Sequence, residues 1–151
     1  EGIDLIPTFI EVLGGDPQQP WLEGRSFLDT LHGRNSESRE FVVAELDYFA
    51  RKARLELKVA ADRAKGWMVR SERWKYVFYE GFEPSLFDLE DDPNELVDRA
   101  SDPSCQGILD EHRDRLFHWF RCRKSTVTVD YGYLDTRHEF ATRGGFIFGE
   151  W

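Results

Sequence analysis

Four histidines and two cysteines are the side chains of this 151-residue sequence that most often bind metals or exchange protons. They are His32, His112, His118, His138, Cys105 and Cys122. No His-x-x-x-His or Cys-x-x-Cys pair occurs, so the spacing predicts no zinc site. His112 falls on the apolar stripe of a predicted helix, a position more typical of a hydrogen-bonded core histidine than of a ligand. We therefore assign no catalytic, cofactor-binding or metal-binding residue.

Other catalytic motifs are missing from the sequence too. It contains no Gly-x-Ser-x-Gly elbow, no glycine-rich phosphate loop and no Cys-x-Pro-x-Arg run. Two cysteines are too few for a disulfide scaffold, which favours a reduced, cytoplasmic compartment. The chain starts at Glu1 without an initiator methionine or an apolar leader, so we expect either a trimmed start or a piece of a longer protein.

An acidic cluster suggests calcium binding, because carboxylate oxygens are the ligands that this ion prefers. Its members are Asp88, Glu90, Asp91, Asp92 and Glu95. The cluster lacks the alternating ligand positions and the terminal glutamate of an EF-hand. Acidic residues are also common around turns and helix starts without metal, so we interpret the cluster as solvated surface.

Aromatic and basic residues alternate between Trp67 and Tyr79, a pattern that suits stacking on nucleic-acid bases. Residues 51–75 hold 9 Lys or Arg against 3 Asp or Glu. In a strand, however, alternate side chains face opposite ways, and one face here must be core. The acidic stretch that follows also disfavours this hypothesis, so we expect no nucleic-acid partner.

The overall composition excludes two broad classes of protein. Aromatic residues make up 15% of the chain, far more than disordered chains carry. No apolar run is long enough to span a bilayer, so we expect no membrane partner. The net charge of −9 comes from residues 80–118, which hold 12 acidic and 3 basic side chains.

Four short segments rich in β-branched and aromatic residues predict strands. They cover residues 41–46, 67–71, 74–79 and 85–89. The last three are too close together for crossover helices, so the sheet is predicted to be antiparallel. Residues 48–65 are charged and alanine-rich, which is typical of a helix or a mobile excursion.

Helical patterns lie on both sides of these strands. Residues 3–13 have a broad apolar face, with Asp4 placed to cap and a double glycine as the stop. Asp91 opens a predicted short helix to Arg99, and Asp102 caps a longer one to about Arg123. The long helix has one neutral stripe, which predicts that it covers one face of the sheet. The stripe consists of Cys105, Ile108, Leu109, His112, Leu116, Trp119 and Phe120.

These elements predict an α+β fold: a small antiparallel sheet of about four strands packed by a long helix. An N-terminal helix and a C-terminal arm flank this sheet, and we expect both to pack against partners outside it. We expect residues 1–40 to end one domain and connect it to the next, residues 41–124 to form the α+β subdomain, and residues 125–151 to be the arm.

Three motifs resemble sulfatases, in the order that family has them. Ile3-Asp-Leu-Ile-Pro-Thr8 resembles the last helix of their catalytic domain, and Leu22-Glu-Gly-Arg-Ser26 the loop after it. The segments Ser71-Glu-Arg-Trp-Lys-Tyr-Val-Phe-Tyr79 and Ser85-Leu-Phe-Asp-Leu89 with its Asp-Pro turn resemble their C-terminal signature. The Trp-Met-Val-Arg strand and the Gly-Phe-Ile-Phe-Gly tail are most similar to phosphonate monoester hydrolases of the alkaline phosphatase superfamily.

The resemblance implies an enzyme that cleaves sulfate or phosphonate esters with a formylglycine nucleophile and a divalent metal of the Mn, Ca or Fe class. The family's nucleophile and metal ligands precede the Asp-Leu-x-Pro-Thr helix, so none maps onto this sequence. Tyr48, Arg51 and Arg54 are candidates for the rim of a substrate pocket, although a surface role is the simpler interpretation.

The resemblance therefore predicts a C-terminal fragment that is inactive alone, supports its own catalytic domain and joins subunits through its arm. A free-standing interaction module is the alternative. In that case the Phe146-Ile147-Phe148 tail and the helix over residues 3–13 dock onto a partner.

Overall fold

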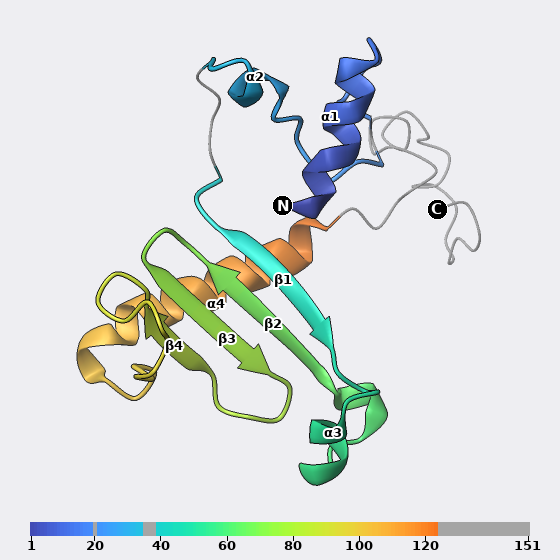
Figure 1. The fold of residues 1–151 in the computed structure, drawn as a ribbon. Helices are drawn as coiled ribbons and strands as arrows, with labels where there is room; N and C mark the ends of the chain where they lie inside the picture. Colours follow the sequence, from blue (N-terminus) through green and yellow to red (C-terminus); the bar gives the residue numbers. More distant parts are fainter. Residues whose placement is uncertain (20, 35–38, 124–151) are drawn as a thin grey trace, which may run out of the picture. The chain divides into compact units, whose positions relative to one another are not determined.

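The computed structural model of the chain describes residues 1–19, 21–34 and 39–123, and its main unit is a four-stranded sheet with one long helix. The strands are β1 (Val42–Asp47), β2 (Lys65–Arg70), β3 (Trp74–Tyr79) and β4 (Ser85–Asp88). They lie in the order β1-β2-β3-β4, each antiparallel to its neighbours, and α4 (Gln106–Cys122) crosses one face (Figure 1). The predicted α+β fold is confirmed.

The connections between the strands explain this topology. Between β2 and β3 the Ser71 amide donates to the Trp74 carbonyl at 2.9 Å, closing a turn that leaves no room for a crossover. The longer excursion between β1 and β2 contains α3 (Lys52–Glu56) and the 3-10 helix η2 (Ala61–Arg63). Its two ends are joined by the Tyr48 amide, which donates to the Ala64 carbonyl at 2.8 Å.

The core of this unit lies between the sheet and α4. Period-two alternation points Val69, Tyr76 and Leu86 toward the helix, where they meet the helical stripe. On the helix side the buried members are Cys105, Leu109, His112 and Leu116, all predicted stripe positions. The predicted packing of the stripe on one face of the sheet is therefore confirmed.

The start of the long helix also follows its sequence pattern. The Asp102 carboxylate accepts from the Ser104 amide at 2.9 Å, and Pro103 opens the 3-10 helix η3 (Pro103–Cys105) that leads into α4. An aspartate cap satisfies an amide that the first helical turn leaves without a partner, and proline loses nothing there.

The predicted short helix from Asp91 to Arg99 is wrong, because this segment forms turns and runs along β4. Its aspartates accept backbone amides in place of helical bonds: Asp92 accepts from the Val97 amide at 2.8 Å. Asp98 accepts from the Leu86 amide of β4 at 3.0 Å. Glu95 has a φ of +57°, which a right-handed helix cannot contain. The Arg99 amide donates to the Leu86 carbonyl at 2.7 Å, so the loop occupies both backbone groups of Leu86 and covers the edge strand.

Residues before position 38 belong to a separate unit, which contains η1 (Gly2–Asp4), α1 (Leu5–Val12) and α2 (Leu28–Leu31). The predicted N-terminal helix is confirmed, and Gly14 with its φ of +81° follows its end. No helix in the described part of the chain is long and apolar enough to cross a membrane. The predicted arm, residues 125–151, lies outside the described residues.

Leu86 tests how far this unit depends on the contact between α4 and the sheet, because its side chain is fully buried there. We expect Leu86→Ala to lower the free energy of unfolding by about 2–5 kcal/mol, through lost burial and the cavity left behind. Leu96→Ala is the matched control, since that side chain is 80% exposed, and a change below about 0.5 kcal/mol is expected. Equal effects in urea unfolding would contradict the proposed core.

Candidate functional site

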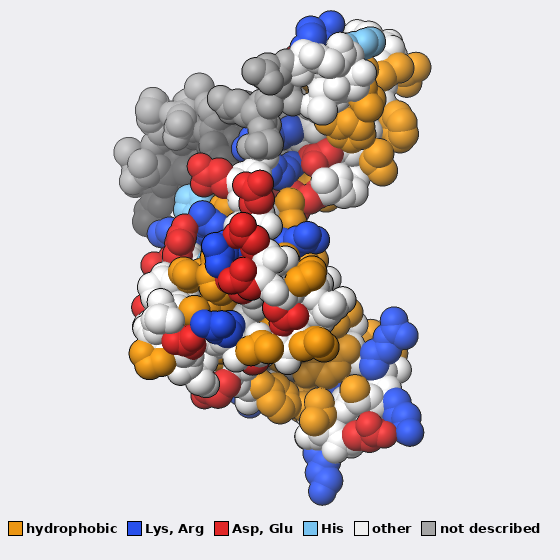
Figure 2. Space-filling view, turned by 60° about the vertical axis from the view of Figure 1, so that its left-hand side comes forward, with side chains coloured by type: hydrophobic (Ala, Val, Ile, Leu, Met, Phe, Trp, Pro, Cys, Tyr) orange, Lys and Arg blue, Asp and Glu red, His pale blue; other side chains and the backbone are white. Residues whose placement is uncertain are grey.

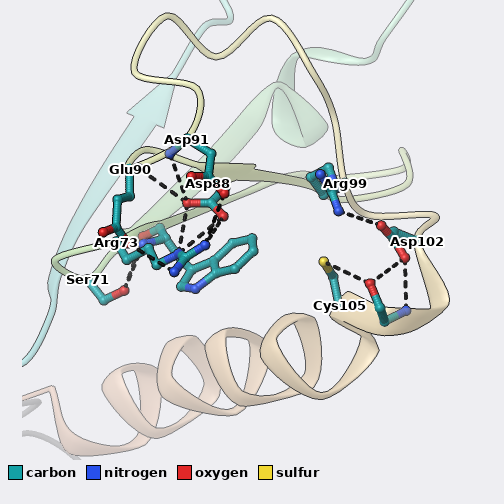
Figure 3. A network of polar contacts seen from close by, with 10 residues as sticks. Ser71, Arg73, Asp88, Glu90, Asp91, Arg99, Asp102 and Cys105 are labelled. Atoms are coloured by element: carbon teal, nitrogen blue, oxygen red, sulfur yellow. Dashed lines mark hydrogen bonds and ion pairs between the residues drawn. The ribbon is translucent and has the colours of Figure 1, made fainter.

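The densest polar cluster of the sheet unit joins Arg73 to Asp88 (Figure 3). The guanidinium donates two parallel hydrogen bonds to the carboxylate, from Nε to Oδ1 at 3.0 Å and from Nη2 to Oδ2 at 2.7 Å. Arg73 precedes β3 and Asp88 ends β4, and the register Trp74↔Asp88 brings them together. The bonds from Arg73 hold the pKa of Asp88 below its ordinary value, so this carboxylate stays ionised in the fold.

The acidic cluster is therefore divided between two roles. Asp88 is only 5% exposed, so its interpretation as solvated surface was wrong: it is a buried partner of an arginine. Glu90 and Asp91 are exposed and pair with the same guanidinium at 2.9 and 3.2 Å. In the described residues no three His, Cys, Asp or Glu side chains are grouped so as to hold a metal ion. These residues do not fit the divalent metal that the family resemblance implies.

A second polar group in Figure 3 surrounds the start of α4. Arg99 Nη2 donates to Asp102 Oδ2 at 2.7 Å, and the Ser104 hydroxyl donates to Asp102 Oδ1 at 2.7 Å. The bonds from Ser104 and Arg99 lower the pKa of Asp102. Cys105 is a buried free thiol with its sulfur 3.8 Å from the Ser104 oxygen. The group caps the helix and carries no reacting centre.

His112 meets the Ser71 hydroxyl, a pairing that in hydrolases often marks a nucleophile and its base. Its Nδ1 donates to the Ile108 carbonyl at 2.9 Å, so Nε2, 3.0 Å from Ser71 Oγ, accepts from that hydroxyl. Ser71 also accepts from the Trp74 amide at 3.2 Å. The histidine is 2% exposed and bonded to its own helix, so it ties α4 to the β2–β3 turn, as expected for a core histidine. Burial lowers its pKa.

The three candidates for a pocket rim have different surroundings. Tyr48 is 6% exposed and packs edge-on against Tyr79 with ring centres 5.9 Å apart, so a surface role is wrong for it. Arg54 donates to the carbonyls of Phe49 and Val59 and holds the α3 excursion together. Arg51 is exposed. These residues do not converge on a common centre.

In the alternating aromatic segment, four of the five rings lie on the helix side of the sheet, and Tyr79 lies on the other side. Trp67, Trp74 and Phe78 pack against the buried cluster, and Tyr76 belongs to it. Trp67 stacks on Phe78 and meets Phe120 of α4 edge-on at 5.3 Å. The side of this segment that faces α4 is therefore core, as the strand pattern predicts.

In the N-terminal unit, the first two motifs that resemble sulfatases contact each other. The Arg25 amide donates to Asp4 Oδ1 at 2.8 Å, and the Phe27 amide donates to Thr8 Oγ1 at 3.1 Å. The Asp4 carboxylate therefore binds the loop. It forms no capping hydrogen bond to α1, so the predicted cap is wrong. A Cβ on Gly24 would lie 2.0 Å from the Ile3 carbonyl oxygen, so only glycine fits. The sequence pattern alone did not identify Thr8 or Gly24 as contact residues.

No protein-family model matches the chain, but individual relatives do. A multifunctional alkaline phosphatase superfamily protein of Trinickia caryophylli is 29% identical over 123 residues, 79% of this chain and 24% of that protein. The delta 4,5-hexuronate-2-O-sulfatase of Bacteroides thetaiotaomicron is 34% identical over 114 residues, 74% of this chain and 21% of the sulfatase. The chain thus spans about a quarter of the length of these relatives.

A solved structure is similar as well. The phosphonate monoester hydrolase of Agrobacterium radiobacter superposes with a TM-score of 0.66 at 28% identity. The match covers 76% of this chain and 23% of that enzyme. The sequence comparison and the structure comparison therefore both find proteins of which this chain matches less than a quarter of the length.

His112 predicts a specific dependence of stability on pH. Its pKa is lowered below the ordinary 6.5, so the unfolded chain binds a proton at higher pH than the folded chain does. The contribution of His112 is full above pH 6.5, and the free energy of unfolding falls as the pH drops through that value. The slope is at most about 1.4 kcal/mol per pH unit.

We expect His112→Gln to remove this slope in urea unfolding measured between pH 8 and 5. His118→Gln, on an exposed position of the same helix, should retain it. Identical slopes in both variants would show that His112 is not the group responsible.

The close approach of Gly24 to Ile3 can be tested by adding a single methyl group. Gly24→Ala places a carbon 2.0 Å from the Ile3 carbonyl oxygen, so the loop must move away from η1, at a cost of about 1–3 kcal/mol. We expect faster hydrogen exchange at the Arg25 and Phe27 amides. Gly2→Ala is the control, because a Cβ there meets nothing within 4 Å. Unchanged exchange in the Gly24 variant would disprove the contact.

Proposed function

Sulfatase-family proteins of the alkaline phosphatase superfamily are homologues of this chain over about three quarters of its length, and on that basis we propose that it is the C-terminal region of an ester hydrolase. The observation that carries this proposal is that the match occupies most of this chain but only a quarter of each relative. The order of the three sequence motifs supports the same placement.

The chemistry of the complete protein then resides in the part of the polypeptide outside this chain. The family resemblance implies a formylglycine nucleophile and a divalent metal there, with displacement at sulfur or phosphorus. The described residues offer no metal-binding group, and Asp88 and His112 are engaged in structural bonds. This chain would support the catalytic part and not react itself.

The substrate class is a sulfate, phosphate or phosphonate ester. One relative is named as a hexuronate-2-O-sulfatase and one structural neighbour as a phosphonate monoester hydrolase. We further propose that residues 125–151 join subunits of a homo-oligomer and that the protein is cytoplasmic. These two statements rest on the sequence alone.

A free-standing interaction module is the second candidate, and exposed apolar side chains favour it. Phe9 and Val12 of α1 and Leu13 after it are 60%, 59% and 86% exposed. Such side chains mark a surface that binds another protein or another part of the same one. The module hypothesis requires that the gene encode no catalytic part upstream of Glu1.

Activity assays separate the two functions. We expect the 151-residue chain to hydrolyse neither 4-nitrophenyl sulfate nor a phenyl phosphonate ester, with or without Mn²⁺ or Ca²⁺. The complete polypeptide encoded by the gene should cleave at least one of them, lose activity in EDTA and recover it with metal.

Mutations in this chain provide the control. Leu96→Ala in the complete polypeptide should leave turnover unchanged, since that side chain is 80% exposed and forms none of the polar contacts described above. Turnover that persists in the repurified 151-residue chain would overturn the proposal, as would a complete polypeptide inactive on every ester.

A further inference from the structure

The sheet has a second face, opposite α4, and its side chains are mostly apolar. We call it the open face, because within this unit no described helix covers it (Figure 1). Its apolar members come from all four strands: Val42, Ala44, Leu46, Met68, Val77, Tyr79 and Phe87.

This composition differs from that of a sheet with one face in water. Antiparallel sheets with a solvated face alternate apolar residues inside with polar residues outside. Here apolar residues occupy the outer positions of β1 and most of those of β3, and the Lys75 ammonium on β3 is paired with Glu95. The pattern indicates a face that another layer covers.

The open face is hollowed between β1, β2 and β3. The groove has a volume of about 220 Å³ and is lined by Leu46, Gly66, Met68, Val77 and Tyr79 among others. The Tyr79 ring lies on Gly66, where a Cβ would be 2.6 Å from the ring. In Figure 2, hydrophobic side chains gather over the lower part of the sheet unit, where the surface is hollowed.

One buried polar atom lies beside this groove. The Tyr48 hydroxyl is enclosed and has no hydrogen-bond partner among the described residues, while its ring rests edge-on against Tyr79. A buried hydroxyl without a partner costs about 1–3 kcal/mol. A group supplied from outside this unit would satisfy it.

The size of the face indicates what kind of layer covers it. Three strands of six residues and one of four span at most roughly 19 by 20 Å, so covering the face buries about 800 Å² in total, counting both sides. Interfaces between domains of one chain bury about 600–1,500 Å², whereas obligate homodimers bury more than about 2,000 Å². The open face therefore suits another domain better than a second copy.

We propose that the open face is the surface on which the larger domain of the same polypeptide packs. This inference rests on the proposed function, since it takes the remaining three quarters of the relatives' length as the source of that domain. The larger domain would place apolar side chains in the groove and a hydrogen-bonding group at the Tyr48 hydroxyl.

Met68 reports on this face without any mutation, because it is the only methionine of the chain and lines the groove. Hydrogen peroxide oxidises accessible methionine to the sulfoxide, which mass spectrometry detects in the Met68 peptide. We expect oxidation in the complete polypeptide to be at least about tenfold slower than in the 151-residue chain. The urea-unfolded protein defines full reactivity.

A matched pair of variants tests the same surface independently. Val77→Lys places a charge on the open face, and Val97→Lys places the same charge on a loop position that is 54% exposed. In the complete polypeptide we expect Val77→Lys to lower Tm and peroxide protection of Met68, and Val97→Lys to change neither.

The outcomes separate this inference from the proposed function. An active complete polypeptide whose Met68 oxidises as fast as the unfolded protein would overturn the inference alone. An inactive polypeptide with protected Met68 would refute the hydrolase function and leave the packing standing. Protection in the 151-residue chain that grows with concentration would show a second copy on the face and overturn the proposal.

Discussion

The sheet unit depends on one contact, the packing of α4 across a single face of four short strands. Val69, Tyr76 and Leu86 meet the helical stripe there, and each such side chain contributes about 1.5–3 kcal/mol by burial. Without the helix these side chains would be exposed to water, and the apolar face of a sheet has to be buried against another element. The loop after β4 and the His112 bond then fix where the helix lies, one at its start and one at its middle.

This constraint explains why side chains with catalytic chemistry have structural roles here. Arg73 and Asp88 join the start of β3 to the end of β4, and Asp102 caps the helical segment that leads into α4. The bond between Ser71 and His112 joins α4 to the β2–β3 turn. Each of these groups forms a hydrogen bond in a partly buried position, where a polar atom without a partner would lower the stability of the fold. A serine next to a histidine is therefore no evidence of a nucleophile when the ring is 2% exposed and packed in the core, out of reach of a substrate.

Much of the fold could be predicted from the sequence, because strands and the long helix follow local periodicity. The stripe from Cys105 to Leu116 and the close spacing of the last three strands were sufficient for the α+β topology. The segment before Arg99 was not predictable in this way, since its conformation is set by bonds to β4 and by the left-handed Glu95. The burial of Asp88 and Tyr48 likewise depends on partners that are distant in sequence.

The motifs that resemble sulfatases carry backbone contacts and no reacting groups. Asp4 and Thr8 accept amides from the loop around Gly24, whose missing side chain allows the approach. In the third motif Ser71, Arg73 and Asp88 hold the strand ends. Contacts of this kind restrict residue type, because a single added methyl group or a lost carboxylate breaks them. Under the function proposed above, the motifs of this region reflect packing of the backbone and not catalysis.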